Sequence, residues 1–369
     1  MNRFADCHVH IRGSKIEEIS AMLDDMHSMG ITDAALQSLP YHGIAENISA
    51  LYWKLNYQKI DLTAFGGMHL TDAYADIPLE KQTQTLLDLG CDGIKLIEMH
   101  TDLVEYTHRF TSDPAYDRML SMLEERGAPL LLHACNPIEC WAESAQGMHP
   151  GLALYQGAAL GREASFEDIF RETLKMLDKH PKLDIVIAHF FFLSSDIDRA
   201  GEILEKYPRL RLDLTPGTDM YFHFMERPEQ WRDFFMTYSD RLLFGTDCNT
   251  YKDFNKEIIE LVYRFLTEPR KFVMPCYGYH EILGLGLPQD TVEKICYTNY
   301  MDFVGNRKKA VDVSGLYDAA ERMLQEVRTN PNPYYEKAMS LLGPRKWQEW
   351  SPEQRSSRDF LERMLEKGE

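Results

Sequence analysis

The sequence lacks both an excess of basic charge and a long apolar run. Its 369 residues carry 40 Lys and Arg against 58 Asp and Glu, which gives a formal net charge of -18 at pH 7. So acidic a chain offers no positive patch to neutralise phosphates, and we expect no nucleic-acid partner. No apolar run approaches the roughly 20 residues of a membrane-spanning helix, so we expect no membrane partner.

Paired cysteines are missing as well. The seven Cys contain no Cys-x-x-Cys, and their odd number excludes a complete disulfide framework. Reduced thiols are typical of cytoplasmic proteins, and the N-terminus has no secretory signal pattern, so a cytoplasmic location is expected. No Gly-x-Gly-x-x-Gly follows the first apolar stretch, which leaves dinucleotide binding without support.

What the sequence does contain is a regular alternation of apolar strands and amphipathic helices. Each expected strand is a nearly continuous apolar run, which is typical of a parallel sheet buried on both faces. Eight such units over about 250 residues predict an α/β fold of the (β/α)8 TIM-barrel type, rather than an open doubly wound sheet. The expected strands are 4–11, 31–36, 62–68, 93–99, 129–135, 183–190, 210–215 and 242–248.

Helical spacing of apolar residues predicts the connecting helices, and Ser165 to Asp168 forms a capping-box pattern at the start of one of them. The barrel is expected to occupy residues 1–306 as one domain. Residues 307–369 are expected to form a C-terminal helical extension, with amphipathic helices within 314–367. The extension has no role in the barrel, so we expect it to pack on the barrel or on a partner subunit of a homodimer.

Polar side chains interrupt several of these apolar strands near their ends. An unpartnered polar group there would cost several kcal/mol, and the C-terminal strand ends of a barrel converge on one mouth. Four histidines and one aspartate at this mouth predict a metal site. They are His8, His10, His133, His189 and Asp247.

These residues stand in motifs that resemble the amidohydrolase-2 branch of the amidohydrolase superfamily, a group of TIM-barrel metal-dependent hydrolases. The motifs are Asp6-Cys-His8-Val-His10, LLLHA around His133, IVIAH ending at His189 and LLFGTD ending at Asp247, and the resemblance covers roughly residues 4–304. It implies that His8, His10, His133 and Asp247 bind a divalent metal. His189 is then either a further ligand or a base. Zn2+ suits such ligands best, and Mn2+ also fits.

The resemblance implies a metal-dependent hydrolase, in which activated water attacks a C–O or C–N bond of a small polar substrate while Asp247 and His189 transfer protons. The alternative is a non-oxidative decarboxylase of a small carboxylic acid, including aromatic ones, on the same site. A third interpretation is a catalytically silent metal-binding or assembly protein. The intact ligand set argues against it.

Four more residues are candidates for substrate binding. Lys95 lies within its strand. Some superfamily branches carry a carbamylated lysine there that bridges two metals. We expect an unmodified Lys95 and one ion, with two ions as the alternative if Lys95 is carbamylated. Arg12 meets either an anionic substrate group or a surface carboxylate. His100 is expected to line the pocket, and Cys135 shares the side of His133. The long connection 136–164 is expected to act as a lid.

Overall fold

A nine-stranded sheet forms the centre of the computed structural model, which describes residues 3–12, 15–40, 44–69, 77–250, 253–274, 276, 278–329 and 357–366. Its hydrogen-bonded order is β8-β7-β6-β5-β4-β3-β2-β1-β9, and neighbouring strands run parallel. The strands are β1 (Phe4–His10), β2 (Ile31–Gln37), β3 (Asp61–Gly67), β4 (Gly93–Met99), β5 (Leu130–Ala134), β6 (Ile185–Ile187), β7 (Leu210–Asp213), β8 (Leu242–Leu243) and β9 (Cys248–Asn249).

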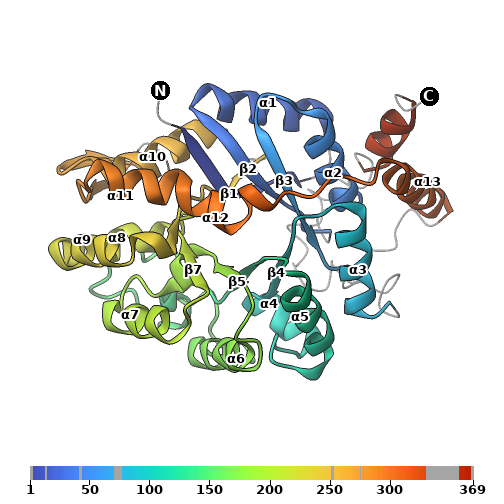
Figure 1. The fold of residues 1–369 in the computed structure, drawn as a ribbon. Coiled ribbons are helices and arrows are strands. Elements are labelled where there is room, and N and C mark those ends of the chain that lie inside the picture. Colours follow the sequence, from blue (N-terminus) through green and yellow to red (C-terminus); the bar gives the residue numbers. More distant parts are fainter. Residues whose placement is uncertain are drawn as a thin grey trace.

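The first and last strands of this order belong to one stretch of chain, residues 242–249. Its β8 end pairs with β7 and its β9 end pairs with β1. Between them, Cys7 N–H donates to the Phe244 carbonyl at 3.0 Å and Asp247 N–H donates to the His8 carbonyl at 2.9 Å. The sheet therefore closes on itself, and the predicted TIM barrel is confirmed. Figure 1 shows the strands at the centre with the helices around them.

Helices connect most of the strands, as the spacing of apolar residues predicted. Two short elements were not predicted, the helix α4 after β4 and the antiparallel hairpin β10 (Lys271–Val273) with β11 (Glu281–Leu283). The helices are α1 (Ile16–Ser28), α2 (Glu46–Asn56), α3 (Leu79–Leu89), α4 (Thr101–Thr107), α5 (Pro114–Arg126), α6 (Phe166–Lys179), α7 (Ile197–Lys206), α8 (Thr218–Glu226), α9 (Pro228–Thr237), α10 (Asn255–Thr267), α11 (Gln289–Glu293), α12 (Asn299–Phe303) and α13 (Val313–Thr329). None of the described helices is long and apolar enough to cross a membrane.

The described parts of the C-terminal extension pack on the outside of the barrel. Helix α13 lies next to α2 and α3 (Figure 1). A second helical stretch, 357–366, places Phe360 edge-on against Tyr52 and pairs Arg363 with Glu17 of α1. Residues 330–356 and 367–369 of the predicted extension lie outside the described residues. Its role at a subunit interface stays a prediction.

Helix α6 begins with the predicted capping box. Ser165 Oγ accepts the Asp168 N–H at 3.1 Å, and the Asp168 carboxylate accepts the Ser165 N–H at 3.0 Å. We expect Ser165→Ala to lower the free energy of unfolding by about 1 kcal/mol. The Asp168 N–H loses its acceptor, and the Asp168 carboxylate loses the hydroxyl that helps to hold it against the Ser165 N–H. Urea denaturation would measure this. Ser28→Ala is the control, since the Ser28 hydroxyl donates to the Asp25 carbonyl at the exposed end of α1 and caps no helix N-terminus. Equal midpoints for the two variants would contradict the expectation.

Candidate metal centre

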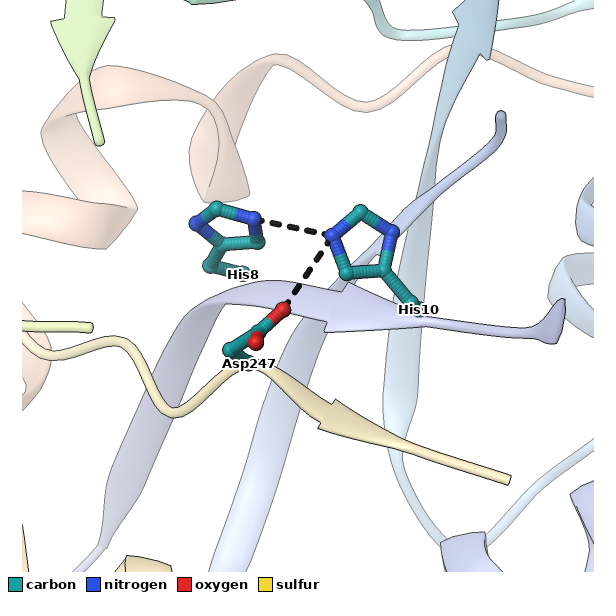
Figure 2. A group of neighbouring side chains, drawn as sticks. All are labelled: His8, His10 and Asp247. Atoms are coloured by element: carbon teal, nitrogen blue, oxygen red, sulfur yellow. Dashed lines mark hydrogen bonds and ion pairs between the residues drawn. The ribbon is translucent and has the colours of Figure 1, made fainter. Parts of the chain in front are cut away.

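The end of β1 and the stretch 242–249 bring three predicted ligands together. His8, His10 and Asp247 each offer a ligand atom, and these atoms all lie within 4.8 Å of one another (Figure 2). His8 Nε2 is 3.0 Å from His10 Nε2, which in turn is 3.3 Å from Asp247 Oδ1. Both imidazoles project together because alternate residues of a strand point to the same side. The two histidines are buried, and Asp247 is partly exposed.

The outer partners of the two imidazoles determine which ring nitrogens face the centre. His8 Nδ1 lies 2.9 Å from Asp213 Oδ2, and His10 Nδ1 lies 3.2 Å from the Gln37 carbonyl oxygen. Because a carboxylate and a carbonyl only accept, each Nδ1 carries the proton and donates it. The Nε2 lone pairs therefore face each other and the Asp247 carboxylate. Electron-rich atoms this close need a proton or a metal ion between them, and this set fits Zn2+ or Mn2+.

Burial keeps His10 in its neutral form and leaves a cationic lysine beside the group. Burial lowers the pKa of His10 well below its ordinary value, although Asp247 acts in the opposite direction. A neutral imidazole is the form that binds a metal. Burial also lowers the pKa of Lys95 to about 8, with Asp213 and Asp247 opposing the shift. Lys95 therefore remains mostly an ammonium group at pH 7.

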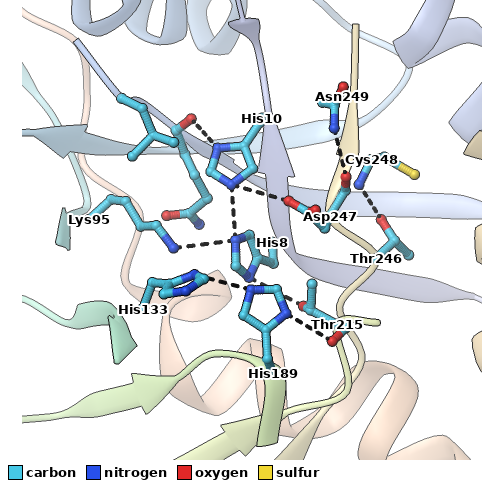
Figure 3. A network of polar contacts seen from close by, with 12 residues as sticks. His8, His10, Lys95, His133, His189, Thr215, Thr246, Asp247, Cys248 and Asn249 are labelled. Atoms are coloured by element: carbon cyan, nitrogen blue, oxygen red, sulfur yellow. Dashed lines mark hydrogen bonds and ion pairs between the residues drawn. The ribbon is translucent and has the colours of Figure 1, made fainter. Parts of the chain in front are cut away.

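His133 and His189 form a second imidazole pair beside the first. His189 Nε2 lies 3.2 Å from His133 Nδ1 (Figure 3), and the His8 and His189 ring centroids are 5.5 Å apart. His133 Nε2 donates to the Cys135 carbonyl at 3.1 Å, and His189 Nδ1 donates to the Thr215 carbonyl at 3.2 Å. Two lone pairs again face each other. Neither histidine belongs to the three-residue group, so their predicted roles as ligands or base stay predictions.

His189 stands at the start of a left-handed turn that sequence reasoning missed. The strand expected over 183–190 ends at Ile187, and residues 189–192 all have φ between 52° and 55°. None of them is glycine, and each left-handed residue costs about 1–2 kcal/mol. Aromatic packing holds the turn: Phe190 contacts Phe224 and Trp231 edge-on, and Phe191 stacks on Phe170. The continuous apolar run in the sequence gave no sign of it.

Asp213 is the other residue that was missed. It is the last residue of β7, is fully buried, and accepts hydrogen bonds from the His8 ring and from the backbone N–H of His189 and Thr215. An acidic residue ending an apolar strand is the same signal that identified Asp247. That signal could have found Asp213.

The substrate-binding candidates fall at different distances from the group. Lys95 is buried, with its Nζ 3.3 Å from His8 Nε2 (Figure 3). His100 caps α4, and its ring centroid lies 5.2 Å from that of His133. Arg12 Nε is buried and makes no hydrogen bond within the part of the chain that the structure describes. The Cys135 side chain is buried in the hydrophobic core.

Comparison with known proteins gives a family and a set of similar folds. The model of a family described as "Amidohydrolase" matches residues 59–303. A putative amidohydrolase from Staphylococcus aureus is 15% identical, with a TM-score of 0.54 over 82% of this chain and 99% of that one. A 2,6-dihydroxybenzoate decarboxylase from Rhizobium is 16% identical, with a TM-score of 0.51 over 82% and 98%.

A third solved structure, a dihydroxybenzoic acid decarboxylase from Polaromonas, contains bound manganese and the inhibitor 2-nitroresorcinol. It is 14% identical, with a TM-score of 0.50 over 82% of this chain and 97% of that one. At such identities these structures show a common fold. No curated protein matches the sequence.

Proposed function

Because the chain belongs to the amidohydrolase family, we propose that it is a metal-dependent decarboxylase that removes CO2 from a small aromatic carboxylic acid without oxidation. Hydrolysis, the main expectation from sequence, becomes the second candidate. Two of the similar folds are decarboxylases of dihydroxybenzoic acids, which supports this order.

The observation that carries the proposal is the position of Lys95. Its ammonium group lies 3.3 Å from His8 Nε2, beside the group that fits a metal ion. Two positive charges facing one space favour a substrate with a carboxylate there. Activation of water by a metal needs no second cation, so Lys95 is better explained by an anionic substrate than by hydrolysis alone.

The reaction needs one proton delivered to carbon. A proton adds to the carbon that bears the carboxylate, and the electrons of the breaking C–C bond then return to the ring as CO2 leaves. We assign delivery of that proton to His189 or Asp247, either of which must first take up a proton from solvent. His8, His10 and Asp247 would hold the metal ion, which would supply positive charge to stabilise the substrate carboxylate. Lys95 holds the other side of the carboxylate.

A direct comparison of products tests the proposal. The purified protein, loaded with Mn2+ or Zn2+, would be given a panel of hydroxylated aromatic carboxylates, lactones and amides. Metal-dependent CO2 release with formation of the decarboxylated product supports the proposal. Hydrolysis is the second candidate because the family is described as amidohydrolase, and the partly exposed Asp247 carboxylate beside His10 would be the acceptor of a proton from water. Acid formation from lactones or amides without CO2 would establish that reaction instead.

We expect Lys95→Met to raise KM for a carboxylate substrate about 10- to 100-fold, because a charged hydrogen bond contributes about 1.5–3 kcal/mol. Metal content should stay at one ion per chain. Steady-state kinetics and metal analysis measure the two effects. Lys54→Met is the control, since Lys54 is also largely buried but pairs with Asp92 away from the group. Two ions per wild-type chain, falling to one in Lys95→Met, would instead indicate a carbamylated lysine that bridges two metals.

A further inference from the structure

We propose that Asp213 is a positioning residue that makes His8 a metal ligand and at the same time fixes the turn that carries His189. This inference rests on the proposed metal-dependent function. Asp213 does not belong to the three-residue group, and it acts through its hydrogen bonds.

The carboxylate of Asp213 divides its two oxygens between two tasks. Oδ2 accepts the His8 Nδ1–H at 2.9 Å. Oδ1 accepts the backbone N–H of His189 at 2.8 Å and that of Thr215 at 3.1 Å. One rigid group therefore sets the tautomer of an imidazole on β1 and the start of the left-handed turn after β6. A displacement of the His8 imidazole would therefore move the turn at His189, and a displacement of the turn would move the imidazole.

A carboxylate in this place is costly, which argues that it has a specific role. Asp213 is fully buried, and burial raises its pKa, while His189 and Lys95 act in the opposite direction. A backbone N–H pair alone could be satisfied by a neutral amide oxygen. A carboxylate can in addition accept the His8 Nδ1–H with its second oxygen at 2.9 Å, closer than the Thr215 hydroxyl oxygen at 3.2 Å, and so leave the Nε2 lone pair for a metal.

Asp213→Asn separates these two tasks because asparagine has the same shape but only one acceptor atom. If its oxygen keeps the two backbone N–H groups, its NH2 group faces His8 Nδ1 at close range, and we expect that nitrogen to become the acceptor, with the Thr215 hydroxyl at 3.2 Å free to donate to it as well. The His8 proton then moves to Nε2, which can no longer bind a metal. If the amide is reversed, its NH2 opposes the N–H groups of His189 and Thr215 and disturbs the turn.

Asp92 offers a matched control. It is also a buried carboxylate that accepts two backbone N–H groups, those of Ala64 at 2.8 Å and Lys309 at 2.7 Å, and one side-chain donor, Lys54 at 2.6 Å. Asp92→Asn therefore removes a comparable buried acceptor, with a comparable loss of folding stability, and leaves the hydrogen bonds of His8 unchanged. Circular dichroism and urea denaturation of both variants would establish that each is folded.

The test measures Zn2+ and Mn2+ affinity by competition with a chromophoric chelator, together with the tautomer of His8 by 15N NMR of the metal-free, histidine-labelled protein. We expect Asp213→Asn to weaken metal binding about 10- to 100-fold and to move the His8 proton from Nδ1 to Nε2, with Asp92→Asn like wild type. Wild-type affinity in Asp213→Asn, an unchanged tautomer, or an equal loss in Asp92→Asn would overturn the proposal. Neither readout requires decarboxylation, so a failure of the proposed reaction can be told apart from a failure of the role proposed for Asp213.

Discussion

The double variant His8→Ala/His10→Ala is expected to lose tight metal binding and to decarboxylate at least about 10³-fold more slowly than wild type. It removes two of the three inward-facing ligand atoms that lie within 4.8 Å of one another. A metal ion contributes several kcal/mol to stabilising charge at the reacting group, and about 4 kcal/mol corresponds to a factor of 10³. Metal content after dialysis and initial rates at saturating Mn2+ would measure the two effects.

A second pair of histidines provides the control for this variant. The His149 and His280 rings meet edge-on with centroids 5.2 Å apart, and neither belongs to the group that fits a metal. His149→Ala/His280→Ala should therefore keep one ion per chain. If His8→Ala/His10→Ala also kept a full equivalent of metal, the ion would be held elsewhere, with His133 and His189 the nearest alternative. That result would contradict the central role of β1.

The site residues at the strand ends could be predicted from the sequence, because burying a polar side chain without a partner costs free energy. Eight such runs alternating with helices predicted a barrel, and a barrel brings strand ends to one mouth. His8, His10 and Asp247 could therefore be placed together before any distance was known. The barrel closes through residues 242–249, as predicted. The strand expected over 242–248 is divided into β8 and β9, with residues 244–247 between them.

The parts that could not be predicted depend on contacts between distant residues. Asp213 meets His8 across 205 positions of the chain, and no local pattern contains the tautomer that follows from this contact. The left-handed turn after β6 is similar, because residues 189 and 190 read as the end of the buried strand expected over 183–190. The turn depends on the packing of Phe190 and Phe191 against α6, α8 and α9 and on the hydrogen bond from the His189 N–H to Asp213.

His189→Asn is expected to lower kcat by about 10²- to 10⁴-fold while leaving metal content unchanged, if His189 delivers the proton to carbon. Asparagine suits this position because it tolerates the left-handed backbone, where His189 has φ 54°. The backbone N–H of residue 189 can still donate to Asp213, so the turn is retained. What the variant loses is the imidazole 3.2 Å from His133 and its capacity to transfer a proton.

The same variant decides between the two roles predicted for His189. A proton donor affects kcat and its pH profile and leaves metal affinity alone, whereas a ligand affects metal affinity first. A fall in metal affinity parallel to the fall in kcat would therefore exclude the proton-transfer role. His223→Asn is the control for losing a buried histidine, because His223 bonds to Ser194 and Glu139 outside the metal group. A similar fall in kcat there would attribute the effect of His189→Asn to general loosening of the loops at the barrel mouth.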